Sequence, residues 1–236
     1  MSSAHARRPT LPAGAIALAA LFVTALVTAQ VTAAKVLAFE LPMTLPLVGP
    51  ELAFPGAALA YALTFLATDC YTELYGKRSA QVLVNVGFVM NFLVLALVWS
   101  TILGPGVDPE FSETFATALG ASTNIVAGSL LAYVVSQNLD VLIFHRLADA
   151  TEGAHLWLRN IGSTGTSQLV DTVIFVGVAF WVFPQYVGIG PEFPASVVVS
   201  LIAGQYLLKL LIALLDTPFV YLITGAVRRS EEPAFA

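Results

Sequence analysis

The residues of this sequence that could bind a polar solute are acids and amides that recur at helical spacing inside apolar stretches. Two segments, 136–144 and 167–175, both read Ser-Gln-x-x-Asp-x-x-Ile-Phe. Positions three, four and seven residues apart share one helix face, so each segment would present one polar face. The two faces could line a binding cavity or join two helices by hydrogen bonds, and these roles are not exclusive. They carry Gln137, Asp140 and Phe144 in the first segment and Gln168, Asp171 and Phe175 in the second.

A third polar stripe closes an earlier apolar stretch. Asp69, Glu73 and Lys77 are spaced i, i+4 and i+8, with Tyr71 and Tyr75 beside them. Ionisable side chains within a membrane span usually face the protein interior or water, because lipid exposure costs about 2.5–3.5 kcal/mol. Asp69 is therefore a candidate site residue. Glu73 and Lys77 could instead form only an i, i+4 ion pair, worth roughly 0.2–0.5 kcal/mol.

Further charged residues lie close to these stripes in the sequence. Lys209 and Asp216 share one face of the last apolar stretch. Arg159, between the two repeats, could neutralise a repeat aspartate or could simply mark the cytoplasmic side. The segment between the repeats ends in a Ser/Thr cluster, and we expect Thr166 and Ser167 to cap the helix that follows.

The composition places these residues in a membrane protein. Of the 236 residues, 58% are hydrophobic and 11% are charged, and the mean hydropathy is +0.84. Ordinary soluble domains are about 45–50% apolar and about 25% charged. A soluble fold of this size could not bury so much apolar surface, which excludes a soluble enzyme, a disordered chain and a coiled coil. We therefore predict an all-α polytopic membrane protein with a single domain over residues 1–236.

Six apolar stretches are long enough to be transmembrane helices, which need about 20 residues. A less apolar segment, Phe111–Gly120, is expected to form an interfacial helix. The first stretch is too long for a cleaved signal peptide, and the fifth is the shortest. The predicted spans are Leu11–Phe39, Phe54–Tyr71, Ala80–Leu103, Asn124–Phe144, Gln168–Phe183 and Pro194–Val227.

The basic residues predict the orientation of these spans. If both termini are cytoplasmic, eight basic residues fall on one side, while the opposite loops are mainly acidic; this follows the positive-inside rule. We therefore expect a multi-pass protein of the cell membrane with cytoplasmic tails at residues 1–10 and 228–236. The eight residues are Arg7, Arg8, Lys77, Arg78, Arg146, Arg159, Arg228 and Arg229.

Several function classes lack their sequence signatures. The net charge of −5 argues against a nucleic-acid partner. Cys70 is the only cysteine, so neither a disulfide within the chain nor a cysteine-based metal site is expected. Gly76 and Lys77 do not belong to a phosphate-binding loop, and the histidines form no zinc-protease motif. We expect no catalytic residue, metal or cofactor, and therefore no enzyme.

Four ordered blocks resemble the queuosine precursor transporter family, part of a vitamin uptake transporter group of six-span proteins. The first reads Thr-Asp-Cys-Tyr-Thr-Glu-Leu-Tyr-Gly-Lys at 68–77, and the second covers the first repeat from 132 to 144. The third runs from the Leu-Trp-Leu-Arg-Asn segment at 156–160 through the second repeat to 175. Lys209 and the Asp-Thr-Pro run at 216–218 form the fourth. The resemblance extends from about residue 60 to 221, which is most of the chain.

This resemblance implies import of 7-deazaguanine bases, the cyano or aminomethyl precursors of modified tRNA nucleosides, by alternating access. A carboxylate can accept hydrogen bonds from the ring N–H and exocyclic amine, an amide can serve the adjacent carbonyl, and aromatic rings can stack on the base. The substrate-binding candidates are Glu73, Asp140, Asp171, Gln137, Gln168, Asn160, Tyr71, Tyr75, Phe144 and Phe175. The candidates for a charge network or for coupling are Asp69, Lys77, Arg159, Lys209 and Asp216.

Two alternatives remain open at the level of sequence. The chain could be the substrate-binding subunit of an ATPase-driven uptake complex, since Ala15 and Ala19 provide a small-x-x-x-small pair for close helix contact. It could also be an intramembrane enzyme or a structural membrane protein, although intramembrane ionisable groups favour a functional site. A homo-oligomer is compatible with each of these readings.

Overall fold

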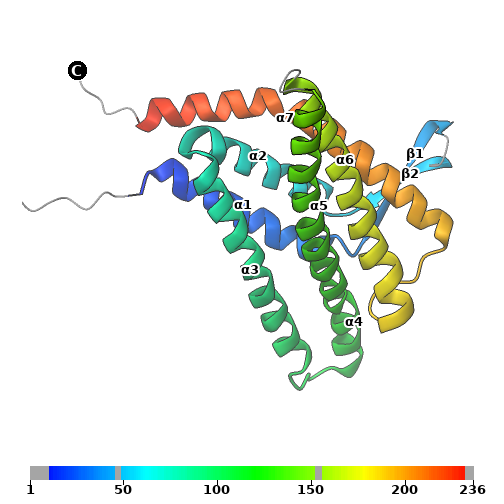
Figure 1. Ribbon diagram of the computed structural model, residues 1–236. Helices are drawn as coiled ribbons and strands as arrows, with labels where there is room; N and C mark the ends of the chain where they lie inside the picture. Colours follow the sequence, from blue (N-terminus) through cyan, green and yellow to red (C-terminus); the bar gives the residue numbers. More distant parts are fainter. Residues whose placement is uncertain (1–10, 46–48, 152–155, 232–236) are drawn as a thin grey trace, which may run out of the picture.

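The computed structural model describes residues 11–45, 49–151 and 156–231 (Figure 1). Helices dominate this part of the chain, and the exceptions are a two-stranded hairpin and one π-helical segment. The elements in order are α1 Ala13–Thr32, β1 Val36–Leu45, β2 Gly49–Pro55, α2 Ala58–Tyr75, α3 Lys77–Ile102, α4 Pro109–Gly120, α5 Ser122–Ala150, α6 Leu156–Gly177, η1 Val178–Val187 and α7 Ala195–Glu231.

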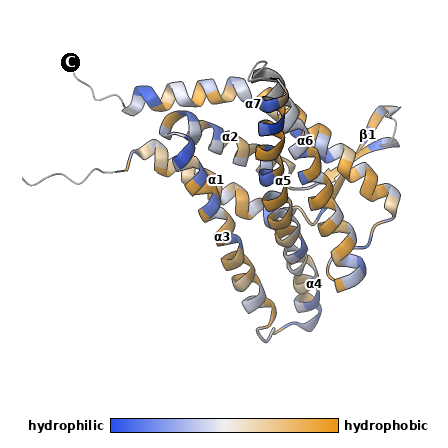
Figure 2. Cartoon of the chain, viewed as in Figure 1, coloured by the Kyte–Doolittle hydropathy of each residue, from blue (hydrophilic) through white to orange (hydrophobic). Residues whose placement is uncertain are grey.

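The helices confirm the prediction of an all-α polytopic membrane protein. Five helical segments of the described chain are long and apolar enough to cross a membrane. The sixth packed helix, α2, has 18 residues and carries Asp69 and Glu73 near its end. Figure 2 shows hydrophobic residues along most of the helical surface, with hydrophilic residues gathered in short patches such as the upper part of α5. The five segments are Ala13–Thr32, Lys77–Ile102, Pro109–Leu147, Gly162–Val187 and Ala195–Ser230.

The predicted first span, Leu11–Phe39, is wrong in its last seven residues. The helix ends at Thr32, and the chain then forms an antiparallel hairpin in which Val36 pairs with Pro55 and Phe39 pairs with Leu52. Hydropathy alone could not distinguish the strand from a continuation of the helix, because a short apolar run is compatible with either. The hairpin packs against α7. At Gly204 of α7, an added Cβ would overlap the carbonyl oxygen of Ala53.

The predicted fifth span, Gln168–Phe183, is too short at both ends. Helix α6 already begins at Leu156 and continues into the π-helix η1, which contains Pro184. Thr166 and Ser167 therefore lie inside α6 and do not cap it; the Ser167 hydroxyl donates to the Thr164 carbonyl one turn earlier, at 3.1 Å. Such back-bonding lets a hydroxyl-rich segment remain helical. Proline lacks an N–H group, and a wider π-turn accommodates it.

The predicted stripe of Asp69, Glu73 and Lys77 is interrupted by a helix break. Gly76 separates α2 from α3 with φ = 86°, a backbone conformation that side-chain-bearing residues rarely adopt. Lys77 therefore begins a new helix and does not continue the face of Glu73. Glu73 instead accepts a 2.6 Å hydrogen bond from Arg228 near the end of α7, in an exposed ion pair.

The core is built from small residues that let the helices approach closely. Alanines of α1, α2, α5 and η1 form one buried cluster with larger side chains of α6 and α7. At Gly128 of α5, a Cβ would lie 3.0 Å from the carbonyl oxygen of Phe175 on α6. Small residues serve this purpose in membrane proteins because helix association there depends on packing and interhelical hydrogen bonds. Figure 1 shows α5 and α6 side by side, which fixes the two repeats against each other.

Candidate functional site

A central cavity of about 270 Å³ lies among six helices, α1, α2, α3, α5, α6 and α7. Both polar and aromatic side chains line it, and the only charged residues among those that line it are Asp171 and Lys209. The aromatic lining residues are Phe22, Tyr61, Phe65, Phe88, Tyr133 and Phe175. The amide and hydroxyl lining residues are Gln30, Thr64, Thr68, Ser129, Ser136, Gln137, Gln168 and Gln205.

The two charged residues neutralise each other across the cavity wall. The Lys209 ammonium group donates to Asp171 Oδ2 at 2.5 Å, and the two side chains are 11% and 22% exposed. The other oxygen, Asp171 Oδ1, accepts a 3.1 Å hydrogen bond from Ser136 on α5. A carboxylate offers about four lone-pair sites. Asp171 is therefore held by α5 and α7 at once and retains acceptor capacity towards the cavity.

The two repeats exchange hydrogen bonds. Ser136 of the first repeat donates to Asp171 of the second, while Ser167 of the second donates to Asp140 of the first, both at 3.1 Å. The arrangement resembles a local two-fold relation between α5 and α6. The two repeats contribute differently to the central cavity. Both glutamines, Gln137 and Gln168, line it, but Asp171 is the only one of the two repeat aspartates that does.

An aromatic pair closes the side of the cavity next to α3. The rings of Phe88 and Tyr133 stack with centroids 4.1 Å apart and an interplanar angle of 26°. The Gln81 amide donates to the Tyr133 hydroxyl at 2.8 Å and to Asn85 at 3.0 Å. These contacts join α3 to α5 and present a flat aromatic surface beside the polar groups.

A second cavity of about 450 Å³ adjoins the central one and shares Phe65, Gln168 and Lys209 with it. Its wall also contains Asp69 from α2 and Asp216 from α7. The two carboxyl groups lie close enough for their charges and hydrogen-bonding groups to interact. The predicted charge-network residues Asp69, Asp216 and Lys209 therefore gather in one cavity.

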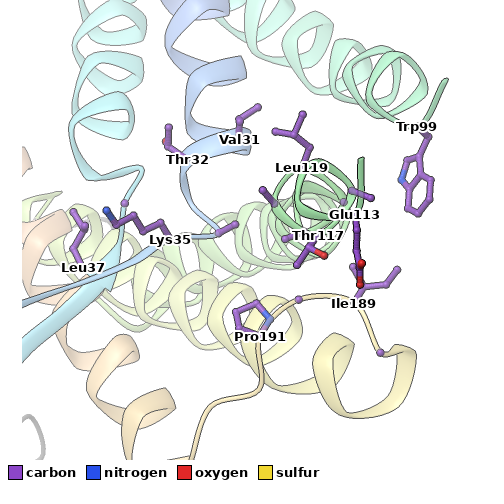
Figure 3. A pocket seen from close by; sticks show the side chains of 18 residues that line it. Val31, Thr32, Lys35, Leu37, Trp99, Glu113, Thr117, Leu119, Ile189 and Pro191 are labelled. Carbon is purple, nitrogen blue, oxygen red and sulfur yellow. The ribbon is translucent and has the colours of Figure 1, made fainter. Parts of the chain in front are cut away.

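A third cavity, of about 980 Å³, lies beside the start of the β-hairpin, where Leu37 lines it (Figure 3). The end of α1, helix α4 and the loop after η1 line it, with Lys35 and Glu113 as its charged residues. Gln30 lines the central cavity while Val31 and Thr32 line this one. The two cavities therefore meet the same turn of α1.

The remaining predicted site residues line neither the central nor the second cavity. Asp140 is bound by Ser167, and Glu73 by Arg228. The rings of Tyr71 and Tyr75 lie against each other, with centroids 4.9 Å apart. Phe144 contacts His145 edge to face, with centroids 6.0 Å apart.

Three more predicted residues have no role in either cavity or cannot be placed. Lys77 is exposed at the start of α3. Arg159 and Asn160 lie in the first turns of α6, and their side chains are outside the described residues.

Several lining residues were absent from the predicted site. Gln30 is a single amide inside an apolar span, and Gln205 stands one turn before Lys209 on the same stripe of α7; this polarity within apolar spans was the signal that could have identified them. Tyr61 lines the cavity with its hydroxyl 3.5 Å from that of Ser129. Nothing in the sequence distinguishes Tyr61, Phe65 or Phe88 from ordinary aromatic packing residues.

A bundle of membrane-spanning helices that encloses polar, charge-neutralised cavities is the architecture of a membrane transport protein. Comparison with known families agrees with this class. Residues 55–223 match the family model described as "Putative vitamin uptake transporter", a range that includes α2 to α6, η1 and most of α7. The chain belongs to this vitamin uptake transporter family.

Individual relatives are named more specifically. The chain is similar to the "Probable queuosine precursor transporter" of Bacillus subtilis (strain 168), 34% identical over 163 residues, which is 68% of this chain and 67% of the relative. It is also similar to the "Queuosine precursor transporter" of Escherichia coli (strain K12), 28% identical over 128 residues, covering 54% of this chain and 56% of the relative. No solved structure matches the chain.

Proposed function

We propose that this protein imports a queuosine precursor, a 7-deazaguanine base, across the cell membrane. The observation that carries the proposal is the central cavity, in which amides from α5 and α6 and a neutralised aspartate lie beside stacked aromatic rings. The names of the relatives supply the substrate class. The volume of this cavity, about 270 Å³, lies just below the range of small-molecule pockets, which measure about 300–1,000 Å³.

The side chains that line the central cavity suit a flat, uncharged bicyclic base. Stacking on an aromatic ring is worth roughly 1–3 kcal/mol per base and requires no countercharge. Lys209 is paired with Asp171, so the described residues that line the cavity include no free cation for an anionic substrate. Gln137 and Gln168 each provide a donor and an acceptor, which matches the mixed hydrogen-bonding edge of a deazaguanine.

The proposed direction of transport follows from the basic residues. Lys77 and Arg78 begin α3, and Arg228 lies in the last turn of α7; Figure 1 shows these two helix ends on the side away from the hairpin, which the positive-inside rule would make cytoplasmic. The large cavity beside the hairpin would then face outwards, and the cavity containing Asp69 and Asp216 would lie on the cytoplasmic side. Alternating access would require the helices to open one end and then the other around the central cavity.

Uptake of a labelled 7-deazaguanine into bacteria that cannot synthesise it tests the proposal. We expect the wild-type chain to support uptake and Gln137→Leu to reduce it at least tenfold at low substrate concentration, because a hydrogen bond to the base is lost. Asn138→Leu is the matched control, since the neighbouring Asn138 amide donates to the Val134 carbonyl of its own helix and does not line the cavity. Absence of uptake by the wild type would contradict the proposal.

The same experiment in proteoliposomes tests whether the chain works alone. We expect vesicles that contain only this protein to take up the base without ATP. If uptake appears only after an ATPase complex is added, the chain is the binding subunit of a larger transporter and not an independent importer.

A further inference from the structure

Two buried glutamines of the central cavity have amide oxygens without a hydrogen-bond donor. Gln30 on α1 is 1% exposed and Gln205 on α7 is 6% exposed, and both line the cavity. The Oε1 atom of each accepts no hydrogen bond from any residue in the described part of the chain. By contrast, the exposed Gln81 is bonded to Tyr133 and Asn85. Protein interiors rarely leave buried acceptors unused.

Both glutamines follow residues at which their helices are closely packed. Gln30 follows Ala29, a fully buried member of the main core cluster. Gln205 follows Gly204, where a Cβ would overlap the carbonyl oxygen of Ala53 on the hairpin. The backbone of α7 is therefore pressed against β2 at this point. Both amides therefore belong to closely packed parts of their helices, and an acceptor buried there gains a hydrogen bond only from a group inside the protein.

A rigid cavity with unused acceptors selects a ligand that brings donors. Such a site discriminates strongly against analogues that lack the N–H group, because the protein acceptor then stays unpaired. A 7-deazaguanine base carries N–H donors at two separated places, the amine-bearing edge of its six-membered ring and the nitrogen of its five-membered ring. Two acceptors on different helices, α1 and α7, can address both.

Resting on the proposed function, we infer that Gln30 and Gln205 determine substrate specificity by accepting hydrogen bonds from the transported base, one from its exocyclic amine and the other from the N–H group of its five-membered ring. The cavity should consequently prefer free bases that carry donors on both rings. It should reject the same heterocycle when either donor is replaced by hydrogen or methyl. Neither glutamine takes part in the Asp171–Lys209 pair, so this recognition is separate from the charge network.

Calorimetric binding to the purified full-length protein in lipid nanodiscs tests the inference. We expect Gln30→Leu and Gln205→Leu each to weaken binding of 7-deazaguanine by about tenfold to a hundredfold. The matched control is Asn91→Leu: Asn91 is also a buried amide without a hydrogen-bond partner among the described residues, but it does not line the cavity. Unchanged affinity in both glutamine variants would overturn the inference while leaving the proposed function intact.

The ligand can be altered as well as the protein, which keeps the test valid if a variant does not fold. We expect wild-type protein to bind 7-deazahypoxanthine, which lacks the exocyclic amine, and 9-methyl-7-deazaguanine, which lacks the five-ring N–H, at least tenfold more weakly than 7-deazaguanine. Each glutamine variant should lose discrimination against one of the two analogues. Equal affinity of the wild type for all three compounds overturns the inference alone. Failure of the wild type to bind any of them overturns the proposed function as well.

Discussion

Ser136 on α5 donates a 3.1 Å hydrogen bond to Asp171 on α6, although the two residues are 35 positions apart in the sequence. The corresponding pair in the opposite sense, Ser167 and Asp140, has the same length. Each repeat therefore supplies the hydroxyl that holds the aspartate of the other. Asp171 lines the central cavity and Asp140 does not. The hydrogen bond from Ser136 therefore positions a cavity residue, whereas the bond from Ser167 does not.

This difference predicts unequal effects of the two serine variants. Ser136→Ala and Ser167→Ala should each lower stability by about 0.6 kcal/mol, the average for interhelical hydrogen bonds in a membrane protein. Only Ser136→Ala should also raise the substrate concentration needed for half-maximal uptake, since Asp171 lines the cavity. Thermal unfolding and uptake kinetics measure the two effects. Equal kinetic defects would show that Asp140 also serves the substrate.

Removing Lys209 should leave Asp171 as an uncompensated charge among the helices. We expect Lys209→Met to destabilise the protein by up to about 3 kcal/mol, because breaking a largely buried ion pair costs more than the pair itself contributes, and partial exposure lowers that cost. The double variant Lys209→Met with Asp171→Asn should recover much of this loss in chemical unfolding. Stability that falls further in the double variant would mean that the aspartate is held mainly by Ser136.

The contact of α7 with the hairpin predicts a steric effect at Gly204. Gly204→Ala should destabilise the protein by about 1–3 kcal/mol, because the new methyl group would overlap the backbone of Ala53 and overpacking must shift one element. Gly225→Ala on the same helix is the control, since a Cβ there meets nothing within 4 Å. Alanine in place of an interior helical glycine should stabilise by about 0.5–1 kcal/mol. Opposite signs in thermal unfolding are the expected result.

The exposed ion pair of Glu73 and Arg228 should contribute little to the stability of the protein. Both side chains are more than half exposed, at 56% and 57%, and surface ion pairs are typically worth about 0–1 kcal/mol. Glu73→Gln should therefore leave both stability and uptake nearly unchanged. A severe loss of uptake would show that Glu73 approaches the substrate in another conformation of the transporter.

Periodicity and composition predicted much of the fold because apolar helices of membrane length have a strong signature. These two signals failed where the chain departs locally from a regular α-helix. The strand after Thr32 continues the apolar run of α1, and the π-helix η1, which contains Pro184, extends the fifth span beyond its predicted end at Phe183. The predicted spans already left a break between residues 71 and 80, but the stripe of Asp69, Glu73 and Lys77 was extended across it, because the spacing of these residues continues the helical period past Gly76.

Individual site residues were harder to predict, because a stripe of polar residues identifies one face of a helix but not which helix or cavity that face meets. Gln168, Asp171 and Phe175 share a face, and the structure turns that face to the central cavity. Asp140 occupies the equivalent position of the first repeat, yet it is bound to Ser167 away from the cavity. Only the packing of α5 against α6 and of α7 against α6 determines which copy is exposed to the cavity.

The neutral pair of Asp171 and Lys209 bears on the energy available for transport. A site with no net charge that carries an uncharged base moves no charge through the membrane field, so the membrane voltage neither drives nor opposes that step. A base with an ammonium group would differ, because one elementary charge gains about 2.3 kcal/mol per 100 mV across an inside-negative membrane. For an uncharged base, inward flow would then depend on what keeps its free concentration in the cell low.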